Sequence, residues 1–405
     1  MAGNLEYFIP QHGRAKISLR VPESHSLYIC PPACGRRVGL RSIKNGEFDR
    51  ISFMYLKEAD VVTGKYLKLI PQAVEELLEV LDPAPQAFLV YVNCIDDFLG
   101  TDETALLHSL QKAFPGQRFV ICHINPVAAD EKIPPGAAMQ NQLYSLLDPA
   151  DPQTMLTEHS VNLIGNYVIP DLAGELYELL RIWGIDTVRH LPNLQTFEEF
   201  QKMAAARANL VLMEMGRYAA QKMEERLGIP WLDLRISYSV QEVEEGYRKL
   251  AALLGKRPYA ADGSALWEAY KEKAYAAIRH CADAAGDTPI VVDSSAVSRP
   301  FALAKALTGY GFTVCCVFLT HGGKDFDREE RLWIEEHCPH TQIIRAGRYD
   351  QAAWNLPPDS ILIGYDAAFS AGRQDYVDIR RDETLFGFHG ICRLMEMITE
   401  VCARI

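Results

Sequence analysis

The stretch AFLVYVNCIDDFLGTDETALLHSLQKAFPGQRFVICHI, residues 87–124, contains one complete unit of the pattern that decides the fold. Its first seven residues form an apolar run that predicts a buried strand, and residues 118–124 predict a second strand. Between them, residues 104–114 have the spacing of an amphipathic helix, which Pro115 and Gly116 end. A strand, a helix and a second strand joined by short connections form a βαβ unit, which indicates a parallel sheet.

The same alternation extends in both directions from this unit. Before it lies a helical pattern at 66–81, and after it a Pro-, Ala- and Asp-rich region at 125–158 that predicts a helix flanked by loops. A second block alternates predicted strands at 161–168, 186–192 and 209–214 with helices at 174–184, 196–206 and 216–228. Helical patterns at 241–254 and 265–285 lead to a third block, with strands at 288–295, 313–321, 341–347 and 360–366 and a final helix at 388–405. We therefore expect an α/β protein of three Rossmann-like αβα domains with mostly parallel sheets, at 1–158, 159–286 and 287–405.

Length and composition agree with this picture and exclude several classes of protein. At about 150 residues per domain, 405 residues correspond to two or three domains. A hydrophobic content of 48% with 23% charged residues disfavours disorder and coiled coils. The net charge of -12, without a strongly basic segment, argues against binding to nucleic acid. No apolar run has the length of a membrane span and the N-terminus lacks a signal peptide pattern, so a cytoplasmic location is expected.

Three of the ten cysteines occupy positions suited to chemistry. Cys94 follows directly on the strand AFLVYVN, at the strand end where open α/β sheets bind ligands. Cys30 and Cys34 lie four residues apart in CPPACGRR, which reads as a Pro-rich turn after the short strand SLYI. Thiolates are ligands of zinc and of iron-sulfur clusters. The alternative interpretation, three unrelated thiols, has equal support from spacing alone. The other seven cysteines fit as small packing residues.

A resemblance to a known family changes this balance. Residues 61–102 resemble a segment of nitrogenase component 1, in which a helix and a strand lead to a cluster-binding cysteine and an Ile-Gly-Asp-Asp turn. PPACGRR is similar to the family's upstream Gly-Pro-x-Gly-Cys loop and matches Cys34 to its cysteine. Residues 161–214, 216–232 and 291–314 and the segment LFGFHGICRLMEMI (385–398) resemble later parts of that family. The resemblance covers roughly residues 27–400. The superfamily that the chain resembles includes the dark-operative protochlorophyllide reductase and the nickel-tetrapyrrole reductase of coenzyme F430 synthesis.

Two departures from nitrogenase limit what the resemblance implies. The thiolate that holds the large cofactor in the nitrogenase α subunit corresponds to Leu212, six residues before Tyr218, and an aliphatic side chain does not bind iron. A gap-free count back from LFGFHG places the cofactor histidine near Val377. The first of the family's three cluster cysteines has no counterpart, because residues 1–29 contain no cysteine, and Cys30 is an additional thiol. No iron-molybdenum-type cofactor is therefore expected.

The resemblance implies a 4Fe-4S cluster held by Cys34 and Cys94, with Cys30 as a probable third ligand. Such a cluster takes four thiolates. Two arrangements supply them: two cysteines from each chain of a homodimer, or three from this chain and one ligand from a paralogous subunit in a heterotetramer. The sequence leaves both open.

The chain contains no G-x-x-x-x-G-K-[ST] motif, so it does not hydrolyse ATP through a P-loop. The resemblance therefore implies a separate iron-protein-like ATPase that binds transiently and delivers electrons. Arg36, Arg37 and Arg41 beside the cluster cysteines are candidates for contacting an acidic face of that partner, although exposed arginines are commonly just solvated. After Cys94, Asp96, Asp97 and Asp102 are candidate proton donors, and Asp102 fits better as the cap of the helix that follows.

These features favour the catalytic component of an ATP-dependent two-component reductase, acting on a small molecule in a cavity between domains. A conjugated substrate such as a tetrapyrrole fits, because the substrate itself must lie within reach of the cluster. Candidate cavity residues follow predicted strands, namely Met213, Met215, Tyr218, His321 and Lys324. The alternatives are a scaffold for assembling the nitrogenase cofactor and a non-enzymatic ligand-binding protein.

Overall fold

The computed structural model describes residues 19–124, 133–256, 264–320, 326–346, 356–380 and 382–404. These residues form three four-stranded sheets, and every strand pair in them is parallel. Contacts divide the described chain into two compact units. The N-terminal unit comprises 19–167 and 187–233 and holds two sheets, while the C-terminal unit comprises 168–186 and 234–404 and holds the third.

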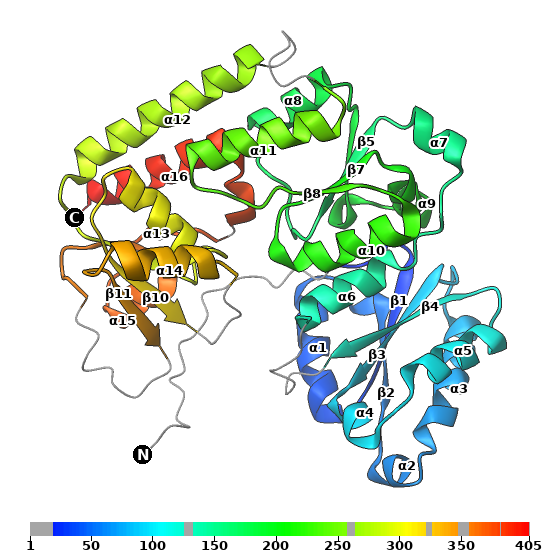
Figure 1. Ribbon diagram of the computed structural model, residues 1–405. Helices are drawn as coiled ribbons and strands as arrows, with labels where there is room; N and C mark the ends of the chain where they lie inside the picture. The colour runs from blue at the N-terminus through cyan, green and yellow to red at the C-terminus, as the bar shows by residue number, and fades with distance from the viewer. Residues whose placement is uncertain are drawn as a thin grey trace. The chain divides into compact units, whose positions relative to one another are not determined.

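The first sheet of the N-terminal unit has the strand order β2-β1-β3-β4 (Figure 1). Its strands are β1 (Ser24–Cys30), β2 (Ile51–Tyr55), β3 (Ala87–Asn93) and β4 (Arg118–Ile124). One face packs on helices α3 (Tyr66–Val80) and α5 (Glu103–Ala113) through a core that contains Ile29, Val90 and Ile121. The other face carries Cys30 and Tyr91 and packs on α6 (Pro135–Tyr144) and, at its margin, α1 (Pro32–Lys44).

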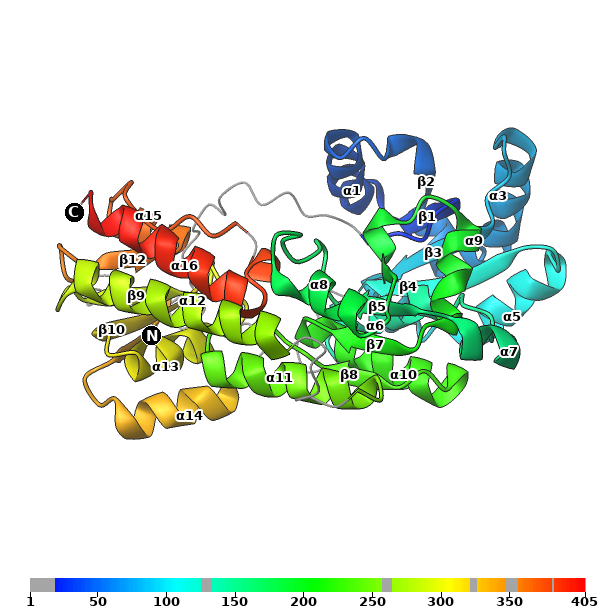
Figure 2. The ribbon, with the colours of Figure 1, turned by 90° about the horizontal axis from the view of Figure 1, so that it is seen from above.

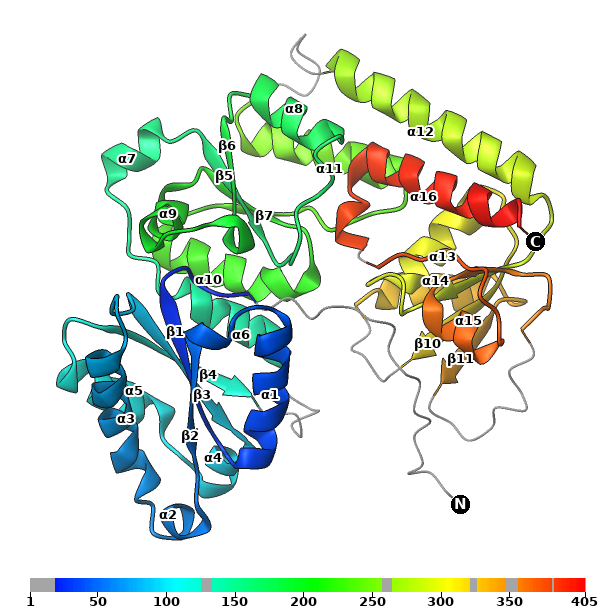
Figure 3. The same ribbon diagram turned by 180° about the vertical axis from the view of Figure 1, so that it is seen from behind.

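The second sheet has the order β6-β5-β7-β8. Its strands are β5 (Ser160–Ile164), β6 (Thr187–His190), β7 (Ala208–Val211) and β8 (Trp231–Asp233), and its helices are α7 (Pro152–Thr157), α9 (Phe197–Gln201) and α10 (Arg217–Leu227). Helix α6 contacts both β4 and α10, so it lies between the two sheets, as Figure 3 shows. One continuous core therefore runs through both sheets of this unit.

The C-terminal unit is built on the sheet β11-β10-β9-β12. Its strands are β9 (Ile290–Asp293), β10 (Val314–Thr320), β11 (Gln342–Ala346) and β12 (Ile361–Ile363). Its helices are α8 (Glu175–Ile182), α11 (Val240–Leu253), α12 (Ser264–Ala285), α13 (Pro300–Gly309), α14 (Arg328–His337), α15 (Tyr365–Ser370) and α16 (Gly387–Cys402). The long helix α12 packs along α16, side by side in Figure 2.

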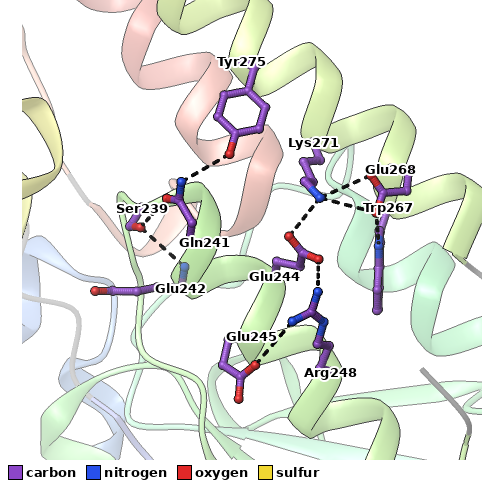
Figure 4. A network of polar contacts seen from close by, with 10 residues as sticks. All are labelled: Ser239, Gln241, Glu242, Glu244, Glu245, Arg248, Trp267, Glu268, Lys271 and Tyr275. Atoms are coloured by element: carbon purple, nitrogen blue, oxygen red, sulfur yellow. Dashed lines mark hydrogen bonds and ion pairs between the residues drawn. The ribbon is translucent and has the colours of Figure 1, made fainter. Parts of the chain in front are cut away.

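A polar network joins α11 to α12 on the surface of this unit (Figure 4). The ammonium of Lys271 lies 2.9 Å from a carboxylate oxygen of Glu244 and 3.3 Å from one of Glu268. Glu244 also pairs with Arg248, one turn further along α11. The hydrogen bond to Glu244 raises the pKa of Lys271. Partly exposed ion pairs contribute little individually, so the network mainly fixes the register of the two helices.

The predicted fold class is confirmed, since the chain forms three parallel sheets whose strands alternate with helices. One local prediction is wrong: residues 32–44, read as a turn at their start, form helix α1. Pro32 occupies the first helical position, where a missing N–H costs nothing, so the prolines begin a helix rather than a loop. Strand β5 ends at Ile164, earlier than predicted, because Gly165 follows with φ +98°. None of the described helices combines the length and apolarity needed to cross a membrane.

Candidate functional site

The three candidate cysteines gather at the carboxyl edge of the first sheet. Cys30 is the last residue of β1, and Cys94 is the first residue of α4 (Cys94–Leu99), directly after β3. Strands β1 and β3 are parallel neighbours, so both chain ends reach the same edge. Asn93 caps α4 by accepting a hydrogen bond from the Ile95 N–H at 3.0 Å. Cys94 thus follows directly on a strand, as the sequence indicated, while its role as a ligand stays a prediction.

Helix α1 places Cys34 above the same edge. Cys34 is the third residue of α1, and its N–H donates to the carbonyl oxygen of Pro31 at 3.0 Å. The next residue, Gly35, is buried and packs close to Cys30. A Cβ atom at position 35 would lie 3.3 Å from the sulfur of Cys30. Cys30 is 6% exposed, whereas Cys34 is exposed and Cys94 is half-buried.

The environment of Cys30 affects its ionisation. Burial, and secondarily the nearby thiol of Cys34, raises the pKa of Cys30 to about 11. Cys30 therefore carries its proton at neutral pH. Cys34 lies in the first turn of α1. The surface around it is cationic and apolar, formed by the exposed side chains of Arg36, Arg37, Leu40, Arg41 and Ile43.

The described chain does not form a closed metal site at this edge. Across the described ranges, no group of three or more His, Cys, Asp or Glu side chains is arranged to hold a metal ion. Two accessible thiols, at Cys34 and Cys94, therefore lie beside a third that is covered. The donor set fits a soft metal or an iron-sulfur cluster whose remaining ligands come from elsewhere.

The acidic residues after Cys94 have separate roles. The carboxylate of Asp102 accepts a hydrogen bond from the Ala105 N–H at 2.9 Å, which confirms that it caps α5. Asp96 is buried and accepts hydrogen bonds from the Asn93 N–H and the Tyr66 hydroxyl, each at 3.0 Å. Asp97 instead contacts His123 on β4.

Sequence reasoning missed His123 and its second carboxylate partner, Glu103. Both nitrogens of the ring are engaged, with Nε2 3.0 Å from Asp97 and Nδ1 2.7 Å from Glu103. The signal was faint, because His123 appears as one polar residue within an apolar strand. Only the alignment of β4 beside β3, with His123 opposite Val92, brings it next to the segment that follows Cys94.

The predicted substrate residues are divided between described and undescribed parts of the chain. Met213, Met215 and Tyr218 are half-buried at the carboxyl end of β7 and the start of α10. His321 and Lys324 lie outside the described residues. A cavity of about 570 Å³ in the C-terminal unit is lined by other residues, namely Tyr365, Phe369, Gly372, Arg373, Gln374 and Tyr376. The substrate cavity near Met213 therefore remains a prediction.

Two glycines shape the edge of the second sheet near these methionines. Gly165, with φ +98°, follows β5, and Gly216 lies in the turn before α10. A Cβ atom on Gly216 would lie 2.7 Å from the Cα of Gly165. The two turns therefore pack backbone against backbone, which only glycine permits.

The two positions matched to nitrogenase cofactor ligands are both inside the protein. Leu212 is fully buried just after β7, where its N–H donates to the carbonyl oxygen of Ile164 at 3.1 Å. Val377 is 1% exposed and forms a parallel bridge with Ile363. Neither offers a donor atom to a metal.

Fold and site together define an α/β protein of three parallel sheets that presents cysteine thiols at the carboxyl edge of its first sheet. Residues 12–403 match the model of the family described as nitrogenase component 1 type oxidoreductase, and the chain belongs to that family. The resemblance stated from the sequence is confirmed.

Individual relatives lie in two branches of the family. The nitrogenase iron-molybdenum cofactor biosynthesis protein NifE of Klebsiella pneumoniae is 24% identical over 367 residues, covering 85% of this chain and 77% of that protein. The nitrogenase molybdenum-iron protein alpha chain of Bradyrhizobium sp. (strain ANU 289) is 24% identical over 208 residues, covering 48% of this chain and 40% of that protein. The solved structure of nitrogenase Cp1 at pH 6.5 superposes with a TM-score of 0.72 at 16% identity, covering 97% of this chain and 91% of that one, and shows the same fold.

Proposed function

We propose that this chain is the substrate-reducing component of a two-component, ATP-dependent reductase and that it holds a 4Fe-4S cluster at Cys34 and Cys94. The observation that carries the proposal is the placement of these two accessible thiols at one edge of the first sheet, on segments that follow the adjacent strands β1 and β3. Family membership supports an oxidoreductase. When bound, such a cluster accepts and passes on single electrons.

The exposure of the thiols favours one of the two ligand arrangements. Cys34 and Cys94 are accessible, whereas the thiol of Cys30 is covered by Gly35 and keeps its proton at neutral pH. Two cysteines from each of two chains would supply the four thiolates without moving α1. Ligation by Cys30 would need access to a thiol that is buried in this structure. We therefore favour a cluster shared by two chains, with Cys30 as the alternative third ligand.

The chain's own residues would perform the remaining tasks. The exposed guanidinium groups of Arg36, Arg37 and Arg41 would attract an acidic ATPase partner to the cluster edge. That partner supplies two electrons, one at a time, and two protons from solvent complete the reduction of one double bond. Half-buried Met213, Met215 and Tyr218 would contact a conjugated substrate, of which a tetrapyrrole is one example.

Anaerobic purification tests the cluster assignment directly. The protein should be brown and contain iron and sulfide in equal amounts, and it should lose both in Cys34→Ala and in Cys94→Ala. Cys122→Ala is the matched control, because Cys122 is a buried thiol on β4 of the same sheet. Iron and sulfide contents that stay at the wild-type level in Cys34→Ala and Cys94→Ala would refute the assignment. Cys30→Ala then separates the arrangements: retention of the cluster supports two ligands per chain, and complete loss supports three.

A second candidate function is a scaffold that holds a precursor cluster for transfer. It is favoured by the similarity to a cofactor biosynthesis protein over 85% of this chain. The two functions differ in turnover. A reductase consumes a low-potential reductant continuously in the presence of its ATPase partner and ATP, whereas a scaffold releases its cluster once to an acceptor protein and stops.

A further inference from the structure

The imidazole of His123 connects three elements around Cys94. It projects from the end of β4, and its nitrogens contact Asp97 on α4 and Glu103 at the first position of α5. Asp97 lies three residues after Cys94, so the two side chains are one helical turn apart. The ring therefore ties the helix that carries Cys94 to the sheet and to the next helix.

The number of protons in this cluster decides whether both contacts form. A neutral imidazole has one N–H group, which can donate to only one of the two carboxylates. The other ring nitrogen then presents a lone pair to a carboxylate oxygen within hydrogen-bonding distance, and this contact is repulsive unless that carboxyl group carries a proton. A neutral imidazole and two carboxylates hold one proton, on one of the ring nitrogens. Both contacts are favourable only when a second proton is present, on the other ring nitrogen or on the carboxyl group that faces it. At high pH one contact must break.

The surroundings of the Glu103 carboxyl group favour its protonated form. Burial is the largest cause that raises the pKa of the Glu103 carboxyl group; His123 lowers it, and the negative charges of Asp96 and Asp97 raise it. The thiol of Cys122, next to His123 on β4, is fully buried and stays protonated at neutral pH. On the α3 side, Tyr66 donates to Asp96 rather than to the His123 cluster. The surroundings are therefore anionic.

We propose that His123, Asp97 and Glu103 form a proton-dependent latch that positions Cys94. With two shared protons the latch holds α4 against β4 and α5. Loss of one proton releases one contact and loosens the helix that presents the Cys94 thiol. The latch rests on the proposed function only in giving Cys94 a ligand role, and its action on α4 can be measured without any iron.

A metal site and a simple surface ion pair both account for this geometry less well than the proposed latch does. The two nitrogens of an imidazole ring point in divergent directions, so the two carboxylates do not converge with the ring on a single ion. A passive ion pair on the surface would involve one nitrogen and leave the other to water. Here the side chains of His123, Asp97 and Glu103 are only 31%, 38% and 33% exposed.

The test measures the accessibility of Cys94 in full-length protein freed of iron by a chelator. A thiol-alkylating reagent is applied from pH 5.5 to 8.5, and peptide mass spectrometry gives the ratio of Cys94 to Cys34 labelling, so that Cys34 serves as the internal reference. In the wild type this ratio should rise roughly two- to fivefold across the range, as expected for a partly exposed charged contact.

Two substitutions at the latch have opposite expected effects. In Glu103→Gln, the amide N–H₂ can donate to Nδ1 while Nε2–H donates to Asp97, so the latch needs no second proton and the ratio should stay low at every pH. In His123→Asn, the side chain is too short to bridge both partners, so the ratio should be high at every pH. His108→Asn on the exposed face of α5 is the control and should follow the wild type.

Each result decides the proposal. A wild-type ratio that does not change with pH, or a Glu103→Gln ratio as high as that of His123→Asn, would overturn the latch. Amide hydrogen exchange of the peptide 93–102 in the same proteins checks that α4 opens locally rather than by global unfolding. Because no step requires a cluster, failure of the latch and failure of iron binding in Cys94→Ala are separate outcomes.

Discussion

Asn93 on β3 donates a hydrogen bond from its side-chain nitrogen to the carbonyl oxygen of Ile29 on β1, with an N···O distance of 2.5 Å. The same side chain accepts from the Ile95 N–H and caps α4. One residue therefore fixes the spacing between the strand that ends in Cys30 and the helix that begins with Cys94. The metal centre proposed at this edge of the sheet would depend on this spacing.

Replacing Asn93 with alanine should therefore affect both stability and metal binding. Loss of a helix cap and of a buried hydrogen bond together should lower the free energy of unfolding by about 2 kcal/mol. Iron retention should fall as well, because Cys94 is no longer held beside β1. Urea unfolding and iron analysis measure the two effects. Asp102→Ala is the matched control, since it removes the cap of α5 alone and should cost about 1 kcal/mol with iron unchanged.

Gly216 makes a close backbone contact at the edge of the second sheet. In Gly216→Ala the new methyl group would meet the backbone of Gly165 at 2.7 Å, and backbone cannot move aside as a flexible side chain can. We expect a loss of roughly 2–3 kcal/mol in the free energy of unfolding. Gly228→Ala provides the comparison, because its φ of +72° carries strain but nothing lies within 4 Å of the added atom. That variant should lose only about 1 kcal/mol, and equal losses in both would contradict the steric account.

Most of the fold followed from local patterns in the sequence. Apolar runs such as 87–93 are buried strands, and breakers such as Gly228 end helices where expected. Helix α1 was not predicted because Pro31 and Pro32 were read as a turn. Proline is also favoured at the first position of a helix, and Pro32 occupies that position here. Strand β2 was not predicted. It lies at the edge of the sheet and none of its side chains is fully buried, so apolar and polar residues do not alternate clearly along it.

The site was only partly predictable for a different reason. Cys94 could be placed because an apolar strand leads directly to it. The burial of Cys30 beneath Gly35 depends on how α1 folds back over the sheet, and the contact of His123 with Asp97 depends on strand register. Residues 26 apart in sequence meet there, and no spacing in one sequence specifies such a pairing.

Cys122 should make the protein less stable in alkali. Burial raises its pKa to about 12, so above pH 9 the unfolded chain releases a proton that the folded chain keeps. Stability present below pH 9 is therefore lost as pH rises, by about 1.4 kcal/mol per pH unit for this one group. Cys122→Ala should be less stable than the wild type at pH 8, by about 1 kcal/mol for the lost packing.

The difference between these two proteins should shrink above pH 9 and reverse near pH 10, because alanine has no proton to lose. Urea unfolding at pH 8, 9, 10 and 10.5 measures it. The buried tyrosines contribute equally to both proteins except for Tyr28 and Tyr91, whose pKa Cys122 also raises. A difference that stays constant across this range would show that Cys122 ionises as easily in the folded state as in the unfolded one.

Metal content is the sharpest test of what distinguishes this chain from the molybdenum-iron relatives. Leu212 is fully buried just after β7 and Val377 is bridged to Ile363, so the two matched positions contribute only aliphatic side chains and hydrogen-bonded backbone. Iron needs thiolate or comparable donors, and these positions supply none. Active protein should therefore contain no stoichiometric molybdenum or vanadium and about four iron atoms per cluster-binding interface.

Restoring the missing donor gives the converse experiment. Leu212→Cys places a thiol where the resemblance puts the cofactor ligand, yet its neighbours remain packed as in a strand, so iron content should stay at the wild-type value. Molybdenum in active wild-type protein, or iron well above one four-iron cluster per interface, would show instead that other residues hold a large cofactor. That result would favour the assembly scaffold over the reductase, because a scaffold must carry a second cluster in addition to the one at Cys34 and Cys94.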